Sequence, residues 1–254
     1  MAFYFYLSTK IIMVFITKSY QDLFGVRSYI NAIKIPSYNN FITMFKIIDR
    51  NNWKRNPYFD HYFDKIPCTY SITVNIDISR VIRFKTEQNT KLYPLLVYAL
   101  SKAVNCYDEF RTDINENGEV GVWETLHPCY TVFHKESETF SNIWTEWDKD
   151  LNTFLSNYNR DIELYGNNTA IDAKPQAPKN VFPISSLPWT TFTGFNLNIK
   201  PDTGYLLPIF TFGKYFKQED KFYIPLSIQV HHAVCDGFHV SRLVNTIQKI
   251  CTEI

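Results

Sequence analysis

The sequence predicts an α/β fold, a two-layer sandwich in which a mixed, largely antiparallel sheet is covered by helices on one face. Three observations favour this fold class. The 254 residues are 45% hydrophobic and 20% charged, which is enough apolar material to bury a large core. The 21 Phe and 17 Tyr suit strands and apolar pockets. Strand-like and helix-like segments follow one another without the regular βαβ alternation of a doubly wound sheet.

The strand predictions depend on alternating or β-branched apolar runs and on the turn residues between them. Asn117-Gly118 indicates a hairpin turn between two of the runs, and Gln218-Glu219-Asp220 separates another pair. The predicted strands cover residues 68–78, 111–115, 119–124, 130–134, 181–185, 191–199, 205–215 and 221–230.

Helical spacing of apolar residues predicts helices over 79–86, 93–107, 140–165 and 238–254. We expect Ser79 to cap the first helix, Pro94 to lie in the first turn of the second and Gly166 to end the third. Residues 167–180 are predicted to form a loop because two prolines interrupt them. No repeat or linker divides residues 44–254, which we interpret as one domain.

The first 43 residues differ from the rest of the chain. They hold four basic residues against one acid, Asp22, whereas the remainder carries a small net negative charge. Their apolar runs are shorter than the ~20 residues of a membrane-spanning helix, and the order of charge and apolar residues is not that of a secretory signal. We interpret residues 1–43 as an N-terminal appendage, such as a translated leader with the start at Met44. A peripheral membrane anchor and a structural element are the alternatives.

Composition excludes several classes of partner. The formal net charge of +1 argues against nucleic acid, because phosphate binding needs a basic footprint. The five cysteines are widely spaced and include no C-x-x-C, which is the pattern neither of a disulfide framework nor of a zinc site. We therefore expect reduced thiols, no metal, no membrane association and a cytoplasmic protein.

The most informative stretch is His231-His232-Ala-Val-Cys235-Asp236-Gly237, which follows an apolar strand and precedes a helix. Neighbouring side chains on a strand point to opposite faces, so the two histidines are not placed to share a metal ion. A histidine near its ordinary pKa suits proton abstraction at neutral pH, and we favour His232 for this role and a structural role for His231. Asp236 either orients the histidine or, as the helix start beside it favours, holds the turn.

Two nucleophilic mechanisms find little support in the sequence. A serine hydrolase would need a nucleophile elbow, and no G-x-S-x-G is present. Cys235 could be a thiol nucleophile, but it has no orienting partner of its own. The second informative stretch, Ser185-Ser186-Leu187-Pro188-Trp189, fits a loop with a buried Trp, and beside a catalytic histidine it makes Ser185 a candidate oxyanion donor.

Together the two stretches resemble the chloramphenicol O-acetyltransferase family. Further likenesses in order and spacing are Asn52-Trp53-Lys54-Arg55, Ile66-Pro67-Cys68, Tyr93-Pro94, Phe133-His134, Glu138-Thr139-Phe140-Ser141 and Phe195-Asn196-Leu197-Asn198. H-H-x-x-x-D-G alone also occurs in lipoyl acyltransferases and condensation domains, but the combined set is specific. The resemblance runs from about Met44 to Ile254 and implies a CoA-dependent acyltransferase-like fold for residues 44–254.

The resemblance implies a role for individual residues. His232 would be the general base in direct transfer of acetyl from acetyl-CoA to the drug, and Ser185 would bind the oxyanion. Asp236 would be structural and paired with Arg55. The coenzyme would contact Trp189 and Tyr215. The implied chloramphenicol pocket comprises Tyr62, Ile66, Cys68, Tyr70, Phe140, Phe195, Leu197 and Thr211.

The resemblance also implies a homotrimer in which His232 of one subunit faces the pocket of its neighbour. Acetyl-CoA would be a co-substrate, with no metal required. Two other hypotheses stay open at this point. One is a related acyltransferase with another small hydroxyl or thiol acceptor, and the other is a binding protein that only sequesters the drug.

Overall fold

The structure, a computed structural model, describes residues 44–199 and 203–254. The predicted appendage, residues 1–43, lies outside the described residues, so its separation from the domain of residues 44–254 stays a prediction. The strands are β1 (Phe45–Ile47), β2 (Thr69–Asp77), β3 (Thr112–Ile114), β4 (Val120–Trp123), β5 (His127–His134), β6 (Thr139–Trp144), β7 (Val181–Ser186), β8 (Ile209–Phe212), β9 (Phe216–Gln218) and β10 (Lys221–His231).

The helices mostly follow the predicted segments. They are α2 (Asn56–Phe59), α3 (Ser79–Glu87), α4 (Leu92–Val104), α5 (Leu151–Tyr165) and α6 (Gly237–Glu253). A π-helical turn (Asp60–Lys65) and a 3₁₀ turn (Asp108–Phe110) complete the regular structure of the described part.

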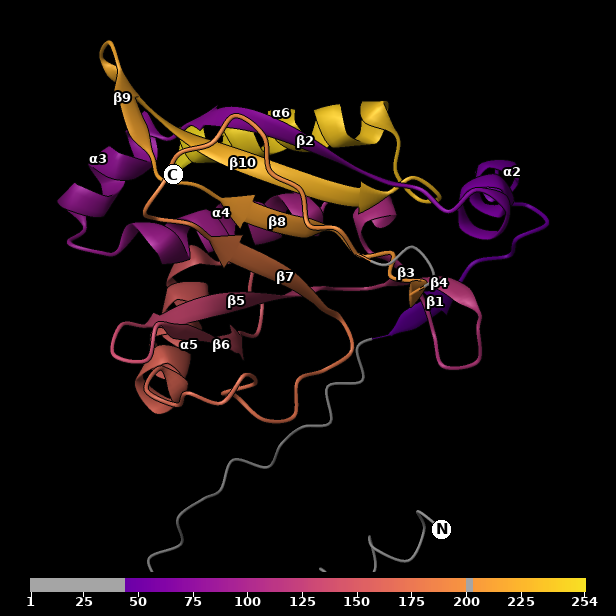
Figure 1. The fold of residues 1–254 in the computed structure, drawn as a ribbon, viewed down its shortest axis with the longest axis horizontal. Coiled ribbons are helices and arrows are strands. Elements are labelled where there is room, and N and C mark those ends of the chain that lie inside the picture. The colour runs from indigo at the N-terminus through magenta and orange to yellow at the C-terminus, as the bar shows by residue number, and fades with distance from the viewer. Residues whose placement is uncertain (1–43, 200–202) are drawn as a thin grey trace, which may run out of the picture. The chain divides into compact units, whose positions relative to one another are not determined.

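The larger sheet has seven strands in the order β2-β10-β8-β7-β5-β6, with β9 paired to β10. The pairs β5–β7 and β7–β8 are parallel and the other pairs are antiparallel. The helices α3, α4, α5 and α6 pack on one face of this sheet (Figure 1). A smaller antiparallel sheet, β1-β4-β3, lies at the side. The predicted fold class is therefore confirmed.

Helix α4 lies at the centre of the helical layer. It packs against α3, α5, α6 and β5, and its side chains Leu95, Val97, Leu100 and Val104 are fully buried. A helix covered on all sides needs apolar residues around its whole circumference, which this segment has. The packing of α4 therefore holds the helical layer against the sheet.

The predicted helix over 140–165 is wrong in its first part. Residues Thr139–Trp144 form β6, which pairs with β5 as a hairpin, and α5 begins only at Leu151. Asp150 caps α5 by accepting a hydrogen bond from the backbone N–H of Thr153 at 2.8 Å. Ile143 is buried, as the predicted helical stripe required, but it is buried on one face of a strand. Its spacing from the apolar residues of α5 is a coincidence.

Three further predictions need correction. Residues 191–199 are not a strand, and their backbone is held instead by side chains of β2 and β10. Ser79 is the first residue of α3 rather than its cap, and its hydroxyl donates to Asp77 at 2.6 Å. The predicted strand 205–215 is shorter, since only Ile209–Phe212 (β8) pairs within it before β9 begins.

Candidate active site

His232 lies directly after β10, where the chain turns toward α6. Its backbone N–H donates to the carbonyl of Cys68 at 2.8 Å, which extends the pairing of β10 with β2 by one residue. The sheet therefore fixes the backbone of the histidine before the turn begins. His231, on the other face, is buried, and its Nδ1 accepts from the N–H of Ala233 at 3.2 Å. Burial, and then the neighbouring His232, lowers the pKa of His231, as expected for a neutral structural ring.

The ring of His232 is oriented by one hydrogen bond and two aromatic contacts. Its Nδ1 lies 3.1 Å from the carbonyl oxygen of Cys235. A carbonyl only accepts, so Nδ1 carries a proton, and in the neutral ring the lone pair therefore lies on Nε2. Tyr62 stacks on the ring with centroids 3.9 Å apart, and Tyr70 packs its edge at 5.4 Å. The ring is thus held in the tautomer that a general base requires.

Arg55 ties the turn together. Its guanidinium donates to the carbonyls of His232 and Ala233, each at 2.9 Å, and to the carboxylate of Asp236 at 3.0 Å. Partial burial acts to raise the pKa of Asp236, but the hydrogen bond from Arg55 and the nearby His239 outweigh it, so this pKa lies below its ordinary value. Asp236 therefore stays charged and paired at neutral pH.

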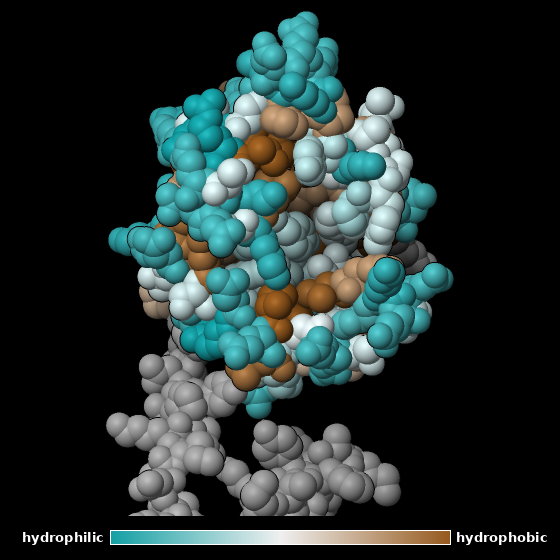
Figure 2. Space-filling model, turned by 90° about the vertical axis from the view of Figure 1, so that its left-hand side faces the viewer, coloured by the Kyte–Doolittle hydropathy of each residue, from teal (hydrophilic) through white to brown (hydrophobic). Residues whose placement is uncertain are grey.

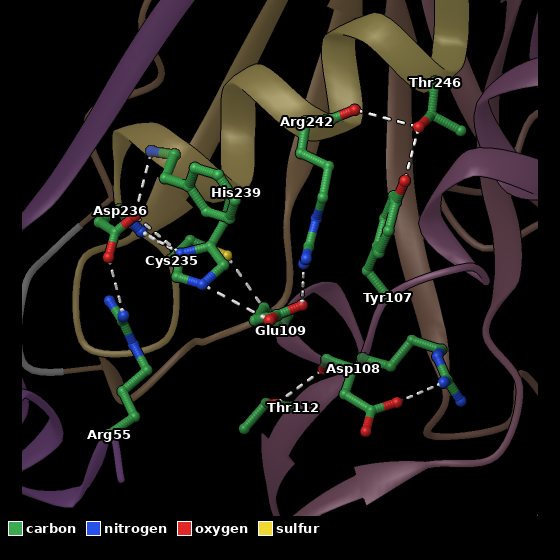
Figure 3. Close-up of polar contacts among 12 residues, drawn as sticks. Arg55, Tyr107, Asp108, Glu109, Thr112, Cys235, Asp236, His239, Arg242 and Thr246 are labelled. Carbon is green, nitrogen blue, oxygen red and sulfur yellow. Dashed lines mark hydrogen bonds and ion pairs between the residues drawn. The ribbon is translucent and has the colours of Figure 1, made fainter. Parts of the chain in front are cut away.

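Asp236 also begins helix α6. Its carboxylate accepts from the N–H of Phe238 at 3.1 Å, and the ring of His239 accepts from the N–H of Asp236 at 3.1 Å, which completes a reciprocal cap (Figure 3). Sequence reasoning identified Asp236 but missed His239. A histidine three residues after the cap was the available signal, because that is the position of the second residue in a capping box.

Ser185 lies near the end of β7, beside Thr211 of β8 in the sheet register. Within the described part of the chain its hydroxyl has no hydrogen-bond partner, so it is available to donate to a ligand. Trp189 follows on an exposed loop, 60% accessible rather than buried as the loop pattern alone suggested. Its ring meets Phe133 at 4.7 Å between centroids, and Phe133 faces Phe140 across the β5–β6 pair.

The residues of the predicted pocket fall into separate groups. Beside His232 lie Tyr62, Cys68 and Tyr70, and beside Ser185 lies Thr211. Ile66 follows the π-helical turn, where its side chain is exposed. Phe195 and Leu197 lie in the segment beside β2 and β10. Their backbone N–H groups donate hydrogen bonds to the side chains of Thr73 and Gln229. Tyr215, half exposed, packs near Phe222 at the start of β10.

His232 and Ser185 of one chain are far apart. The register aligns Ser185 with Thr211 and Thr211 with Ser227, and His232 comes five residues later on β10. At strand spacings this is roughly 17 Å along the sheet and about 10 Å across it. Figure 1 agrees, since β7 and β8 run toward its left-hand side and β10 toward its right. Within a single chain the two side chains cannot contact the same reacting group.

The left-hand end of the molecule is shown in Figure 2, which presents several hydrophobic patches and a hollow between hydrophilic side chains. Exposed aromatic residues near this end of the strands include Phe133, Phe140 and Trp189. Monomeric proteins seldom leave several large aromatic side chains exposed together unless they contact a ligand or another subunit.

Tyr70 leaves a polar atom unsatisfied near His232. Its hydroxyl is buried and has no partner among the described residues. Burial raises the pKa of this hydroxyl far above its ordinary value, so it remains a donor at all ordinary pH values. An unsatisfied buried hydroxyl costs about 1–3 kcal/mol, which a substrate or a neighbouring subunit would recover.

Two alternative chemistries would need an activated thiol or a cluster of metal-ligating side chains. Cys235 is buried, and burial raises the pKa of its thiol far above the ordinary value, so it is not an activated nucleophile. No cluster of three metal-ligating side chains is found in residues 44–199 and 203–254. In the same residues no helix is long and apolar enough to cross a membrane.

The fold is that of acetyltransferases with an α/β sandwich. A solved chloramphenicol acetyltransferase superposes with a TM-score of 0.74 at 22% identity, covering 82% of this chain and 99% of that chain. A dihydrolipoamide acetyltransferase of Azotobacter vinelandii superposes with a TM-score of 0.57 at 15% identity, covering 89% of this chain and 98% of that one. At these identities the likeness concerns the fold alone.

Sequence similarity then defines the family. The family profile described as chloramphenicol acetyltransferase matches residues 43–248. A chloramphenicol acetyltransferase of Campylobacter coli is 56% identical over 209 residues, which is 82% of this chain and 99% of the relative. One from Clostridium perfringens is 50% identical over 207 residues, again 82% of this chain and 98% of the relative. The chain belongs to the chloramphenicol acetyltransferase family.

Proposed function

We propose that this protein inactivates chloramphenicol by acetyl-CoA-dependent O-acetylation. One observation carries the proposal: in a chain of this family, Nε2 of His232 has a free lone pair while Nδ1 is engaged by the Cys235 carbonyl. A general base needs this tautomer and this freedom.

The reaction proceeds as one transfer within a ternary complex. Nε2 of His232 takes the proton of the drug's primary hydroxyl while the hydroxyl oxygen attacks the thioester carbon. A C–O bond forms, and the former carbonyl oxygen becomes the oxyanion of the tetrahedral intermediate. This oxyanion accepts a hydrogen bond from Ser185. The intermediate collapses by breaking the C–S bond, and the imidazolium returns the proton to the sulfur, which leaves as the CoA thiol. No acyl-enzyme forms.

The substrates would bind to the aromatic surfaces described above. The acceptor pocket would be built from Tyr62, Ile66, Cys68, Tyr70, Phe140, Phe195, Leu197 and Thr211. Such walls suit a nitrophenyl ring, which stacks on aromatic faces. Trp189 and Tyr215, both exposed, would contact the coenzyme.

A complete site would require two copies of the chain. His232 and Ser185 are separated by roughly 20 Å within one chain at strand spacings, so a joint role places them on different copies. A head-to-tail contact of this kind closes into a ring, and the family resemblance favours a trimer with the site at each interface. The exposed aromatic side chains and the orphaned Tyr70 hydroxyl support a buried interface or ligand in their vicinity.

The catalytic domain would comprise residues 44–254, with residues 1–43 as an appendage of a cytoplasmic enzyme. Support comes from the family match, which begins at residue 43. A chain starting at Met44 should therefore be active and well behaved in solution. Insolubility or loss of activity of this shorter chain would show that the first 43 residues belong to the working structure.

Release of free thiol from acetyl-CoA, measured with and without chloramphenicol, tests the proposed function. Drug-dependent release that disappears in His232→Ala supports it. Release that requires a different hydroxyl or thiol acceptor would indicate a related acyltransferase. Tight drug binding without thiol release would indicate a sequestering protein, and either result would overturn the proposal.

A further inference from the structure

One peptide group lies between two histidine rings. The carbonyl oxygen of the Cys235–Asp236 peptide faces Nδ1 of His232 at 3.1 Å, and the N–H of the same peptide donates to Nδ1 of His239 at 3.1 Å. A peptide group is planar, and its C=O and N–H point in opposite directions. The orientation of this single plane therefore connects the two rings.

We infer that His239 is a positioning residue for the catalytic base, and that it acts through this peptide group. By accepting the peptide N–H, His239 holds the carbonyl toward His232. The inference rests on the proposed function, in which His232 is the base. His239 itself touches neither the reacting atoms nor a substrate in this account.

The orientation of the peptide decides which nitrogen of His232 can act. While the carbonyl faces the ring, the proton stays on Nδ1 and the lone pair stays on Nε2. If the peptide rotated, Nδ1 would lose its acceptor and the ring could adopt the other tautomer, which has no base at Nε2. A hydrogen bond at the N–H also polarises the peptide, which strengthens its carbonyl as an acceptor.

His239 is itself anchored from two elements. Its Nε2 lies 3.5 Å from Oε1 of Glu109 in the 3₁₀ turn, and Oε2 of Glu109 accepts from Arg242 of α6 at 2.9 Å (Figure 3). The Arg242 guanidinium in turn lies over the ring of Tyr107, 4.2 Å from its centre. The side chain of His239 is only 16% exposed, so these contacts leave the ring little freedom.

A carboxylate oxygen competes for the same nitrogen of His239. Nδ1 of His239 also lies 2.8 Å from the carboxylate of Asp236. A neutral ring can accept the peptide N–H at Nδ1, whereas a protonated ring would donate to the carboxylate and leave that N–H without an acceptor. The orienting hydrogen bond therefore requires that Nδ1 of His239 keep its lone pair and that the proton of the ring lie on Nε2, toward Glu109.

Two variants at this position separate positioning from simple stability. His239→Ala removes the acceptor, and we expect kcat to fall about 10- to 100-fold because a misplaced base loses its alignment. The KM values for chloramphenicol and acetyl-CoA should stay within about twofold, since no binding contact is lost. His239→Gln places an amide oxygen at the same capping position, and it should restore kcat to within about threefold of the wild type.

Asp150→Ala is the matched control. It removes the cap of α5, far from His232 in the sequence and on another helix, and should lower the melting temperature without changing kcat. Wild-type kcat in His239→Ala would overturn the inference. So would a folded His239→Gln variant that is as slow as His239→Ala, and this second variant decides the matter if the alanine variant does not fold.

A readout without substrate keeps the inference separate from the proposed function. In protein labelled with ¹⁵N at histidine, the ring shifts of His232 report its tautomer. We expect the Nδ1–H tautomer in the wild type and in His239→Gln, and a mixture of tautomers in His239→Ala. An unchanged tautomer in His239→Ala would overturn the inference whether or not chloramphenicol is the acceptor, whereas an inactive wild type with the expected shifts would overturn only the function.

Discussion

At the scale of single residues, a few hydrogen bonds determine how one imidazole can react. The Cys235 carbonyl fixes the tautomer of His232, Tyr62 fixes the plane of its ring, and Arg55 fixes the backbone on which it sits. None of these groups reacts. They restrict the rotation and the tautomer of the imidazole ring, which a surface histidine could change freely. A base whose orientation is fixed before substrate binds is more effective.

Substitution of the proposed base and of the proposed oxyanion donor should affect the rate to different degrees. His232→Ala removes the proposed base and should lower kcat about 10²–10⁴-fold or more, because no other group takes its place. Ser185→Ala removes one oxyanion donor and should cost about 10²–10³-fold. Steady-state thiol release measures both, and thermal unfolding checks that each variant is folded. A His232→Ala variant with nearly normal kcat would exclude this residue as the base.

Asp236 is expected to act on structure and rate together. Asp236→Asn weakens the pairing with Arg55 and the cap of α6, so both the melting temperature and kcat should fall. The pKa of Asp236 is depressed, so its stabilising contribution is complete above the ordinary carboxyl pKa and is lost only as the pH falls through the lower, folded-state value. The stability difference between wild type and variant should therefore be smaller in strong acid than at neutral pH.

A rate loss in Asp236→Asn with an unchanged melting temperature would contradict that structural role. It would instead favour a direct part for the carboxylate in orienting the base. Thermal melts across the pH range, at one protein concentration, distinguish the two results because the melting point of an oligomer depends on concentration.

At the scale of elements, the start of β5 is tied to the chain that leads into α5. His127 is buried there, and its Nδ1 accepts from the N–H of Trp147 at 2.9 Å. Burial, with a smaller contribution from the charge of Lys174, lowers the pKa of His127 to about 4. The folded protein therefore holds this ring neutral at pH values where the unfolded chain protonates it.

This difference predicts acid sensitivity. Because the unfolded state binds the proton more tightly, the stability contributed by His127 is complete above about pH 6.5 and declines as the pH falls toward 4. At pH 5 the loss should be about 2 kcal/mol. His127→Asn keeps an acceptor for Trp147 but does not titrate, so urea unfolding should show a smaller loss between pH 7 and pH 5 in this variant. Equal losses in the two proteins would contradict the assignment.

The elements also show how far sequence patterns reach. The strand 68–78, the Asn117-Gly118 hairpin and the last helix were predictable because local periodicity and turn chemistry agree with the tertiary packing there. Residues 140–144 were not, because Ile143 fits a helical stripe as well as the buried face of a strand, and only pairing with β5 decides between them. Residues 191–199 failed for a related reason, since their backbone bonds to side chains rather than to a neighbouring strand.

The residues of the candidate site were likewise only partly predictable from the sequence. The histidine pair and Asp236 could be identified from sequence because the motif is local, and the family resemblance extended the list. The contacts of His239 and Glu109 could not be identified, because the two residues lie far apart in the sequence and meet only when α6 packs beside the 3₁₀ turn. The distance between His232 and Ser185 likewise follows from sheet register, which sequence patterns do not give.

At the scale of the whole molecule, the proposed base and the proposed oxyanion donor of one chain lie at opposite ends of the strands of the large sheet. Enzymes place reacting groups within hydrogen-bond reach of one substrate. If His232 and Ser185 act on one acetyl group, the active site exists only between copies, and each copy contributes to two sites in a closed ring. Catalysis would then depend on assembly as well as on folding.

Complementation between inactive chains tests this account most directly. His232→Ala and Ser185→Ala chains are mixed in equal amounts, unfolded and reassembled together, and drug-dependent thiol release is measured against each variant reassembled alone. With the two groups on different copies, random assembly leaves about one interface in four with both native residues, so activity should return to about a quarter of the wild-type value. Activity no higher than that of the two variants assayed separately would contradict a site shared between copies.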